Sequence, residues 1–218
     1  MPTRSDAEEH LRIIRSLMEK ATIYRAISAP TALVGGLTAT TVAIFFHQQT
    51  DPVRSNFYSE MANGLFLGGW LTALIVTAAA NGVFLWRDAV RRGDKFLSPG
   101  MRAAFRALGP NYLVAGVLTL IFAQSADLLT VPWMLLYALG LLATQHFAPR
   151  SIAWLGWAFL AAGLLVMLTL SAHEPPTPVT MLRNANVAMG LTFGLFHLIY
   201  AACTWPRRGR ASDTGAAP

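Results

Sequence analysis

The chain has 218 residues and a formal net charge of +6, with 54% hydrophobic residues and only 13% charged ones. Soluble proteins carry about 25% charged residues. A soluble fold of this length cannot hide so large an apolar fraction from water, so the composition argues for a membrane protein. The single cysteine, Cys203, excludes a disulfide within the chain.

The first segment, residues 1–28, is charged and amphipathic and predicts a helix on the cytoplasmic side of the membrane. It lacks the apolar run that directly follows the basic start of a secretory signal. Ser5 and Glu8 have the spacing of a capping box. Apolar residues then recur every three to four positions, at Leu11, Ile14, Met18 and Ala21. Such a stripe covers the inner membrane face or the protein's own loops, or it binds a protein partner or a second copy through residues 6–27.

Residues 29–206 carry six apolar runs, each close to the roughly 20 residues that a membrane-crossing helix needs. A helix can cross lipid because it satisfies its own backbone hydrogen bonds. The predicted spans are 30–46, 65–86, 110–129, 131–147, 152–172 and 187–205. The third is the weakest, because it spans only if it continues through Gln124 and Asp127. The small polar residues of 207–218 predict a disordered tail.

The basic residues predict which side each loop occupies. With the N-terminus in the cytoplasm, all of the 17 Lys and Arg except Arg54 and Arg183 fall on the cytoplasmic side of a six-span chain. This is a strong positive-inside bias, which five or seven spans would destroy. We therefore expect both termini in the cytoplasm, and the short loops favour a bacterial inner membrane. Anionic lipid accounts for the net charge, so nucleic acid is not an expected partner.

A similar pattern occurs at two places in the chain. In residues 24–36 and 105–116 an aromatic residue, Arg-Ala, a small residue, Pro, Leu-Val and Gly follow in order. Pro30 and Pro110 both fall at the first turn of an outward-going helix, where proline is tolerated. The pattern predicts an all-α fold of three helical hairpins in the same orientation, an arrangement of parallel repeats that occurs in transporters. Recurrent helix-start chemistry is the simpler explanation, and a true duplication stays open.

Polar groups inside a membrane are candidates for function. His197 lies near the middle of the sixth span, on the same stripe as the GxxxG pair Gly190 and Gly194. A second such pair, Gly64 and Gly68, is also predicted to pack closely against a helix. Residues at a similar depth form a predicted ligand pocket that opens to the cytoplasm: Asn81, Tyr112, Gln145, His146, His197 and Tyr200. The alternative, which we favour from sequence, is that they form only interhelical hydrogen bonds.

Two further histidines, His47 and His173, end the first and fifth spans on the outer side. Two imidazoles at one depth could ligate haem or a metal. No spacing motif supports this, because the histidine at 173 stands in HEPP rather than HExxH and the lone cysteine excludes CxxC. A histidine at a wet helix end is more often solvated, so we expect no metal and no cofactor.

Enzyme signatures are missing from the sequence, which has no GxSxG and no phosphate-binding glycine loop. It also has no deep acidic residue of the kind expected in a proton-coupled carrier. We therefore favour a non-enzymatic multi-pass membrane protein that binds a partner or small ligand and regulates or scaffolds. A small-solute transporter or channel is the alternative, motivated by the possible repeats and the polar pocket. An intramembrane enzyme or haem protein is the third hypothesis.

Overall fold

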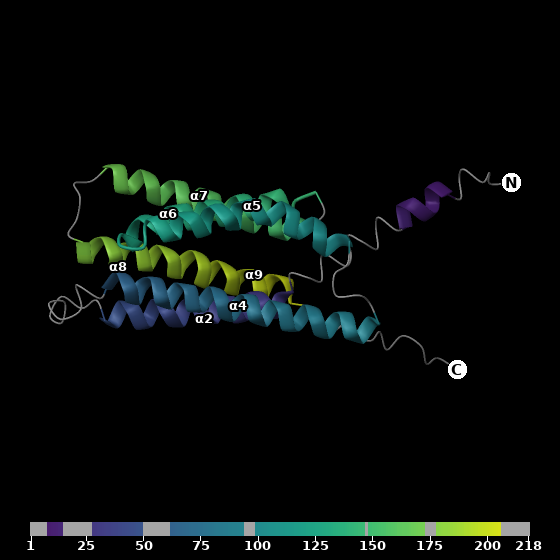
Figure 1. Cartoon of the computed structure of the whole chain (residues 1–218), viewed down its shortest axis with the longest axis horizontal. Helices are drawn as coiled ribbons and strands as arrows, with labels where there is room; N and C mark the ends of the chain where they lie inside the picture. Colours follow the sequence, from purple (N-terminus) through teal and green to yellow (C-terminus); the bar gives the residue numbers. More distant parts are fainter. Residues whose placement is uncertain are drawn as a thin grey trace, which may run out of the picture.

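The computed structural model describes residues 8–14, 28–49, 62–93, 99–146, 148–172 and 178–205, and this part of the chain is helical apart from short turns. The long helices lie side by side in one bundle, and successive helices run in opposite directions (Figure 1). Their bounds are α2 Ala29–Gln49, α4 Ala62–Arg92, α5 Pro99–Ile121, η1 Ala126–Leu129, α6 Thr130–Ala143, α7 Arg150–Ala172, α8 Pro178–Met189, η2 Gly190–Phe196 and α9 His197–Thr204. Five helical stretches are long and apolar enough to cross a membrane, the last being the continuous α8–η2–α9 stretch. The predicted all-α fold is confirmed for the described residues.

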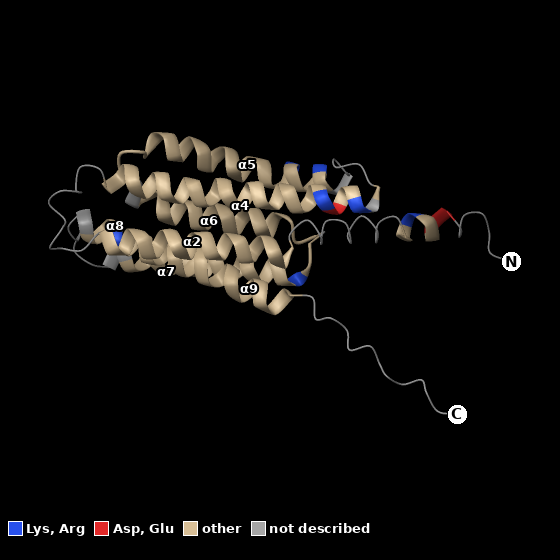
Figure 2. Ribbon diagram, turned by 90° about the horizontal axis from the view of Figure 1, so that it is seen from below, with Lys and Arg blue, Asp and Glu red and all other residues tan. Residues whose placement is uncertain are grey.

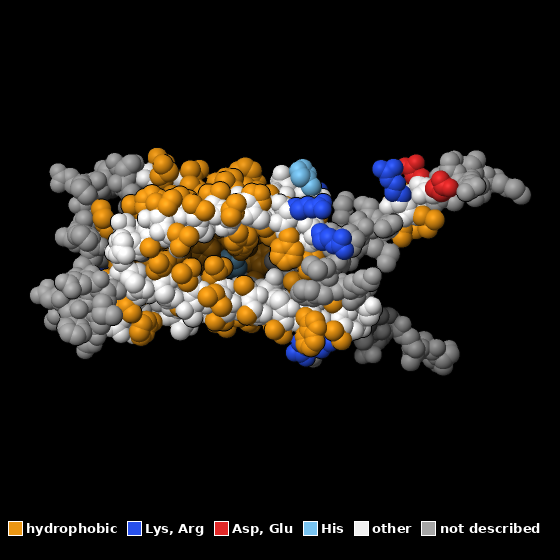
Figure 3. All heavy atoms as spheres, in the orientation of Figure 1, with side chains coloured by type: hydrophobic (Ala, Val, Ile, Leu, Met, Phe, Trp, Pro, Cys, Tyr) orange, Lys and Arg blue, Asp and Glu red, His pale blue; other side chains and the backbone are white. Residues whose placement is uncertain are grey.

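The outer surface of the bundle is apolar along most of its length (Figure 3). Leu113 and Leu120 of α5 are 70% and 81% exposed, and Trp154 of α7 is 74% exposed. A water-soluble bundle would bury many such side chains, whereas lipid surrounds them without penalty. The surface therefore indicates that hydrocarbon, and not water, covers the middle of the bundle.

The helix α5 differs most from its prediction. It begins at Pro99, so Pro110 lies inside the helix and not in its first turn. Pro99 suits a first helical position because an amide there has no intrahelical partner, and most residues after it are good helix formers. The prediction that this span continues through Gln124 is wrong, because α5 ends at Ile121. The Asn63 side chain of α4 donates instead to the Gln124 carbonyl at 2.7 Å, which holds the turn that leads to η1.

The helix α6 is shorter than its predicted span. Its 14 residues extend about 21 Å at 1.5 Å per residue, less than the ~30 Å hydrocarbon core of a bilayer. The helix ends at Ala143, and the Thr144 hydroxyl donates to the Leu141 carbonyl at 2.7 Å. Met134 and Ala138 have no exposed surface. α6 is therefore an inner helix, packed between α5 and α7.

Helix α2 lies at the centre of the packing. It contacts α4 on one side and the α8–η2–α9 stretch on the other, while α7 packs mainly on α6 and only lightly on η2 and α9. Hydrogen bonds support α2 on both sides: the Asn186 amide donates to the Ala43 carbonyl at 2.8 Å, and the Thr31 hydroxyl donates to Asn81 Oδ1 at 3.1 Å. Within each of the first two predicted hairpins the two helices pack together, α2 with α4 and α5 with α6. In the third predicted hairpin, α7 and the α8–η2–α9 stretch make only light contact. The three-hairpin layout stays a prediction.

Glycines let η2 approach α2 closely. A Cβ at Gly194 would lie 2.7 Å from Thr40 Oγ1, and a Cβ at Gly190 would lie 2.7 Å from the Cβ of Ala43. Real Cβ atoms essentially never show contacts this short. The GxxxG pair of the last helix therefore lies where small residues are needed for close helix packing.

The GxxxG pair of α4 lies in a different environment. A Cβ added at Gly64 or Gly68 would meet nothing within 4 Å, and both residues are exposed. Within the described residues, neither glycine makes the close helix contact that the sequence predicted. A GxxxG spacing marks a face with little side-chain volume, and the contacts of the fold decide whether a helix covers that face.

Lys and Arg side chains gather at one end of the bundle (Figure 2). The end of α4 carries Arg87 and Arg91, α5 carries Arg106 near its start, and α7 begins at Arg150. Arg183 lies in α8, towards the opposite end. This distribution is the one expected when one end of a helical bundle faces the cytoplasm.

The helix at residues 8–14 lies apart from the bundle in Figure 1, and every residue in it is exposed. Its apolar residues Leu11, Ile13 and Ile14 are about half exposed or more. Residues 1–7 and 15–27 of the predicted helix, and the tail at 207–218, lie outside the described residues.

Candidate functional site

A hydrogen bond between two side chains joins α6 to α9 inside the bundle. The Tyr137 hydroxyl lies 2.7 Å from His197 Nε2. Tyr137 comes from the middle of α6, and His197 is the first residue of α9. A tyrosine–histidine pair of this kind can hold a proton in a defined place, because each partner can donate to or accept from the other.

Aromatic rings enclose this pair. We define the aromatic cluster as Tyr137, Phe159, Phe193, Phe196 and His197. Tyr137 lies 4.8 Å from Phe159 and 5.2 Å from Phe193, measured between ring centroids. The His197 ring is stacked on Phe193 at an interplanar angle of 11° and lies 5.5 Å from Phe159. The cluster therefore surrounds one imidazole and one phenol with apolar rings from α7 and η2.

The π-helical segment η2 positions the C-terminal half of the cluster. A π-helix is rare in proteins and is frequently found at functional sites. In η2 the glycines face α2, as described above, while Phe193 and Phe196 contact the rings of α6 and α7. The wider π-turn and the small glycines together allow one segment to contact α2 closely and still present bulky rings to the opposite side.

The second ring nitrogen of His197 is buried and has no hydrogen-bond partner among the described residues. Either partner of the Tyr137–His197 hydrogen bond can be the donor, because the roles of the ring nitrogens depend on the tautomer. Leaving a buried polar atom unpaired costs about 1–3 kcal/mol, so His197 has unused binding capacity.

The surface of the bundle is not closed everywhere. The helices α4 and α5 follow one another in the chain but do not pack together, and the face that they form is hollowed in its middle (Figure 3). We call this feature the hollow. Tyr112 of α5 is 51% exposed, and Tyr137 packs against the buried cluster that contains Tyr200. The membrane-facing surface of the bundle therefore has a lateral opening (Figure 3).

The structure brings together only part of the pocket predicted from sequence. His197 is hydrogen-bonded to Tyr137, Tyr200 belongs to the buried cluster against which Tyr137 packs, and Tyr112 is an exposed residue of α5. Asn81 instead accepts the hydrogen bond from Thr31 between α4 and α2. Gln145 and His146 are exposed in the turn that follows α6.

Sequence reasoning missed Tyr137 and the phenylalanines of the cluster. Tyr137 is the one tyrosine in the apolar run 131–147. Its hydroxyl in an otherwise apolar span could have marked it as a candidate. The phenylalanines gave none, because a phenylalanine in a membrane helix faces lipid as readily as it faces a neighbouring ring.

The haem hypothesis involves His47 and His173. His47 lies near the end of α2 and is exposed, and His173 lies outside the described residues. Among the described residues no three His, Cys, Asp or Glu side chains are grouped so that they could hold a metal ion. The expectation of no cofactor stays a prediction, and haem ligation by His47 and His173 stays its minor alternative.

No protein-family model, curated protein or solved structure matches the chain. The function of the protein is therefore inferred from its own geometry.

Proposed function

We propose that the protein is a non-enzymatic membrane protein that binds a small ligand at the aromatic cluster, beside the Tyr137–His197 pair. The observation that carries this proposal is a partly buried histidine that is hydrogen-bonded to Tyr137 and whose buried second nitrogen has no partner among the described residues. The bundle surface is also hollowed in its middle (Figure 3). Polar groups in membrane helices are expensive and are retained mainly for pairing or function. The Tyr137 hydroxyl is hydrogen-bonded to only one of the two ring nitrogens of the imidazole.

The surroundings of the pair indicate the chemistry of the ligand. The cluster offers aromatic faces and two polar groups, and none of its members is Lys, Arg, Asp or Glu. A charged ligand would lose its hydration there without an opposite charge to compensate. A flat or apolar neutral molecule with one hydrogen-bonding group fits the site best, because such pockets bind through apolar contact and are specific through a few polar groups. The hollow faces lipid, so the ligand enters from the membrane.

The proposal includes six spans in a bacterial inner membrane, with both termini in the cytoplasm. Five stretches have the length of a span, and η1 with α6 would form the sixth, shorter crossing. The gathering of Arg side chains at one end supports a cytoplasmic assignment for that end. In this topology α2 begins and α9 ends on the cytoplasmic side.

The exposed helix at 8–14 supports a second role at the same end. Its uncovered residues Leu11, Ile13 and Ile14 would dock residues 6–27 on the inner membrane face or on a protein partner. Such docking would let ligand binding in the bundle regulate a partner at the membrane surface.

The ligand should remain bound when the full chain is gently solubilised from its native membrane. Native mass spectrometry of the wild type should then show a bound small molecule that His197→Ala loses. Gln145→Ala, which removes an exposed polar side chain of the same predicted pocket, is the matched control and should retain the molecule. Absence of any bound species from the wild type, or equal retention by His197→Ala, would overturn the proposal.

Transport of a small solute is the second candidate, because the π-helical segment η2 of the last helix contributes residues to the aromatic cluster. Such π-helical turns are frequently found at functional sites. Reconstituted vesicles distinguish the two functions: a transporter gives solute flux that His197→Ala reduces, whereas a binding protein gives the same flux as empty vesicles.

A further inference from the structure

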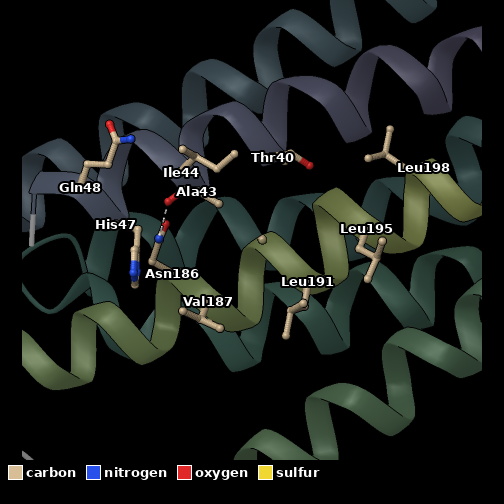
Figure 4. A pocket seen from close by; sticks show the side chains of 11 residues that line it. Thr40, Ala43, Ile44, His47, Gln48, Asn186, Val187, Leu191, Leu195 and Leu198 are labelled. Atoms are coloured by element: carbon tan, nitrogen blue, oxygen red, sulfur yellow. Dashed lines mark hydrogen bonds between the residues drawn. The ribbon is translucent and has the colours of Figure 1, made fainter.

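A second feature lies on the other side of η2 from the aromatic cluster. Helix α2 and the α8–η2–α9 stretch border a groove of about 480 Å³ (Figure 4). Its polar end is formed by His47 and Gln48 of α2 and by Asn186 of α8. From there the groove continues between apolar side chains, among them Leu191 and Leu195.

The groove exists because its floor is made of small residues. Gly190 and Ala43 both line it, and their close approach leaves no room for a larger side chain between the helices. On the rim, Ile44 is 55% exposed and Leu191 is 52% exposed. Apolar side chains this exposed on a membrane-spanning bundle face lipid, so the groove is open to hydrocarbon along its length.

The length of the groove matches one leaflet of a bilayer. Asn186 and Leu198 line its two ends, and twelve residues of α-helix at 1.5 Å per residue would rise about 18 Å. The π-helical segment η2 lies between them and makes the distance somewhat shorter. Half of a ~30 Å hydrocarbon core is about 15 Å. A linear apolar chain that starts at the headgroup level would therefore reach from the polar end to the bilayer centre.

The polar end indicates the kind of headgroup. Asn186 is almost fully buried and donates its amide N–H to the Ala43 carbonyl, which leaves its Oδ1 without a partner among the described residues. Oδ1 of Asn186 is a hydrogen-bond acceptor, so a headgroup that donates a hydrogen bond would satisfy it. The residues that line the groove include no Lys or Arg, so none of them offers a positive charge to a phosphate group.

We propose that this groove holds one acyl chain of a phospholipid whose headgroup donates a hydrogen bond, as an ethanolamine ammonium does. The bound lipid belongs to the leaflet at the end opposite the gathered arginines. Its ammonium lies at the polar end beside Asn186, and its chain lies along Leu191 and Leu195. This site is separate from the aromatic cluster, and its occupant differs from a neutral ligand that enters through the hollow.

The test compares two lipids that differ mainly in donor capacity. The full chain is placed in nanodiscs with equal amounts of phosphatidylethanolamine and phosphatidylcholine of the same chains, released, and analysed by native mass spectrometry. We expect one retained phosphatidylethanolamine, about five- to tenfold over phosphatidylcholine, because the choline group has no N–H to donate. Equal retention of the two lipids would overturn the proposal.

Filling the groove supplies a second, independent measurement. Leu191→Trp adds bulk at the rim and should reduce the retained lipid several-fold. Leu168→Trp, which changes an exposed leucine on α7, is the matched control and should leave retention unchanged. If Leu191→Trp does not fold, Leu195→Trp takes its place. Unchanged retention in the groove variant, or a groove covered by a second copy of the chain in a lipid-free dimer, would refute the assignment.

Discussion

At the scale of single residues, the Tyr137–His197 pair is the most informative feature of the molecule. Its 2.7 Å hydrogen bond lies among four phenyl and phenol rings, where water cannot substitute for a lost partner. Interhelical hydrogen bonds in membranes contribute about 0.6–2 kcal/mol each. The pair therefore stabilises the α6–α9 contact modestly, and its value for function is the fixed orientation of the imidazole.

Tyr137→Phe removes only the hydroxyl and leaves His197 Nε2 unpaired. We expect a loss of about 1 kcal/mol, because the lost bond lies inside the bundle. A loss of this size lowers the Tm by about 2–4 °C in a chain of this length. Thermal unfolding in detergent measures the change.

Tyr112→Phe is the control for this prediction, because Tyr112 is exposed and no hydrogen bond between its hydroxyl and another described residue is seen. It should leave the Tm unchanged. A shift of equal size in the two variants would mean that the Tyr137 hydroxyl has no special role.

The sequence predicted those site residues whose chemical type is unusual in a membrane helix. His197 could be found from sequence because a histidine is rare within an apolar helix and the nearby glycines indicated a packed face. Asn81 and Gln145 were grouped with it only by depth along their helices. Depth does not specify rotation about a helix axis, so it could not show that Asn81 faces Thr31 or that Gln145 faces solvent.

At the scale of helices, close packing between α2 and η2 depends on glycine. Gly194→Ala would place a methyl group 2.7 Å from Thr40 Oγ1, which forces a shift of the side chain or the helix. Overpacking of this kind costs about 1–3 kcal/mol. The Tm of Gly194→Ala should therefore fall clearly below that of the wild type.

The exposed glycine Gly68 provides a matched control on α4. Gly68→Ala meets no neighbour and replaces a poor helix former with the best one, worth up to about 1 kcal/mol. We expect an unchanged or raised Tm. A marked loss of stability in Gly68→Ala would show that something packs on this face of α4.

Helix boundaries were predicted least well where proline and polar residues occur together. Pro110 indicated a helix start, yet the helix formers after Pro99 extend the helix through it. Gln124 was placed inside a span only to reach the length of a bilayer. The structure instead forms a turn there, held by the side chain of Asn63, a contact between distant residues that no local pattern contains.

At the scale of the whole molecule, hydropathy and charge predicted the all-α bundle and the basic end without any tertiary information. They could not predict which helices pack together. α7 follows α6 and leads to α8, and only side-chain shape decides that it packs on α6.

The lone cysteine tests the sidedness of the bundle. Cys203 is exposed near the end of α9, so a membrane-impermeant maleimide should label it from the cytoplasmic side only. A Cys203→Ser chain that carries Ser5→Cys should label from the same side, because an even number of spans places both ends together. Intact cells and inverted vesicles supply the two sides, and labelling of the two positions from opposite sides would contradict a six-span chain.

The central claim is that a ligand binds beside Tyr137 and His197. An experimental map of the full chain in lipid nanodiscs, prepared from native membranes without added ligand, tests it most directly. We expect non-protein density in the hollow, in contact with the aromatic cluster. A map in which protein side chains fill the hollow and no density contacts either residue of the pair would contradict it.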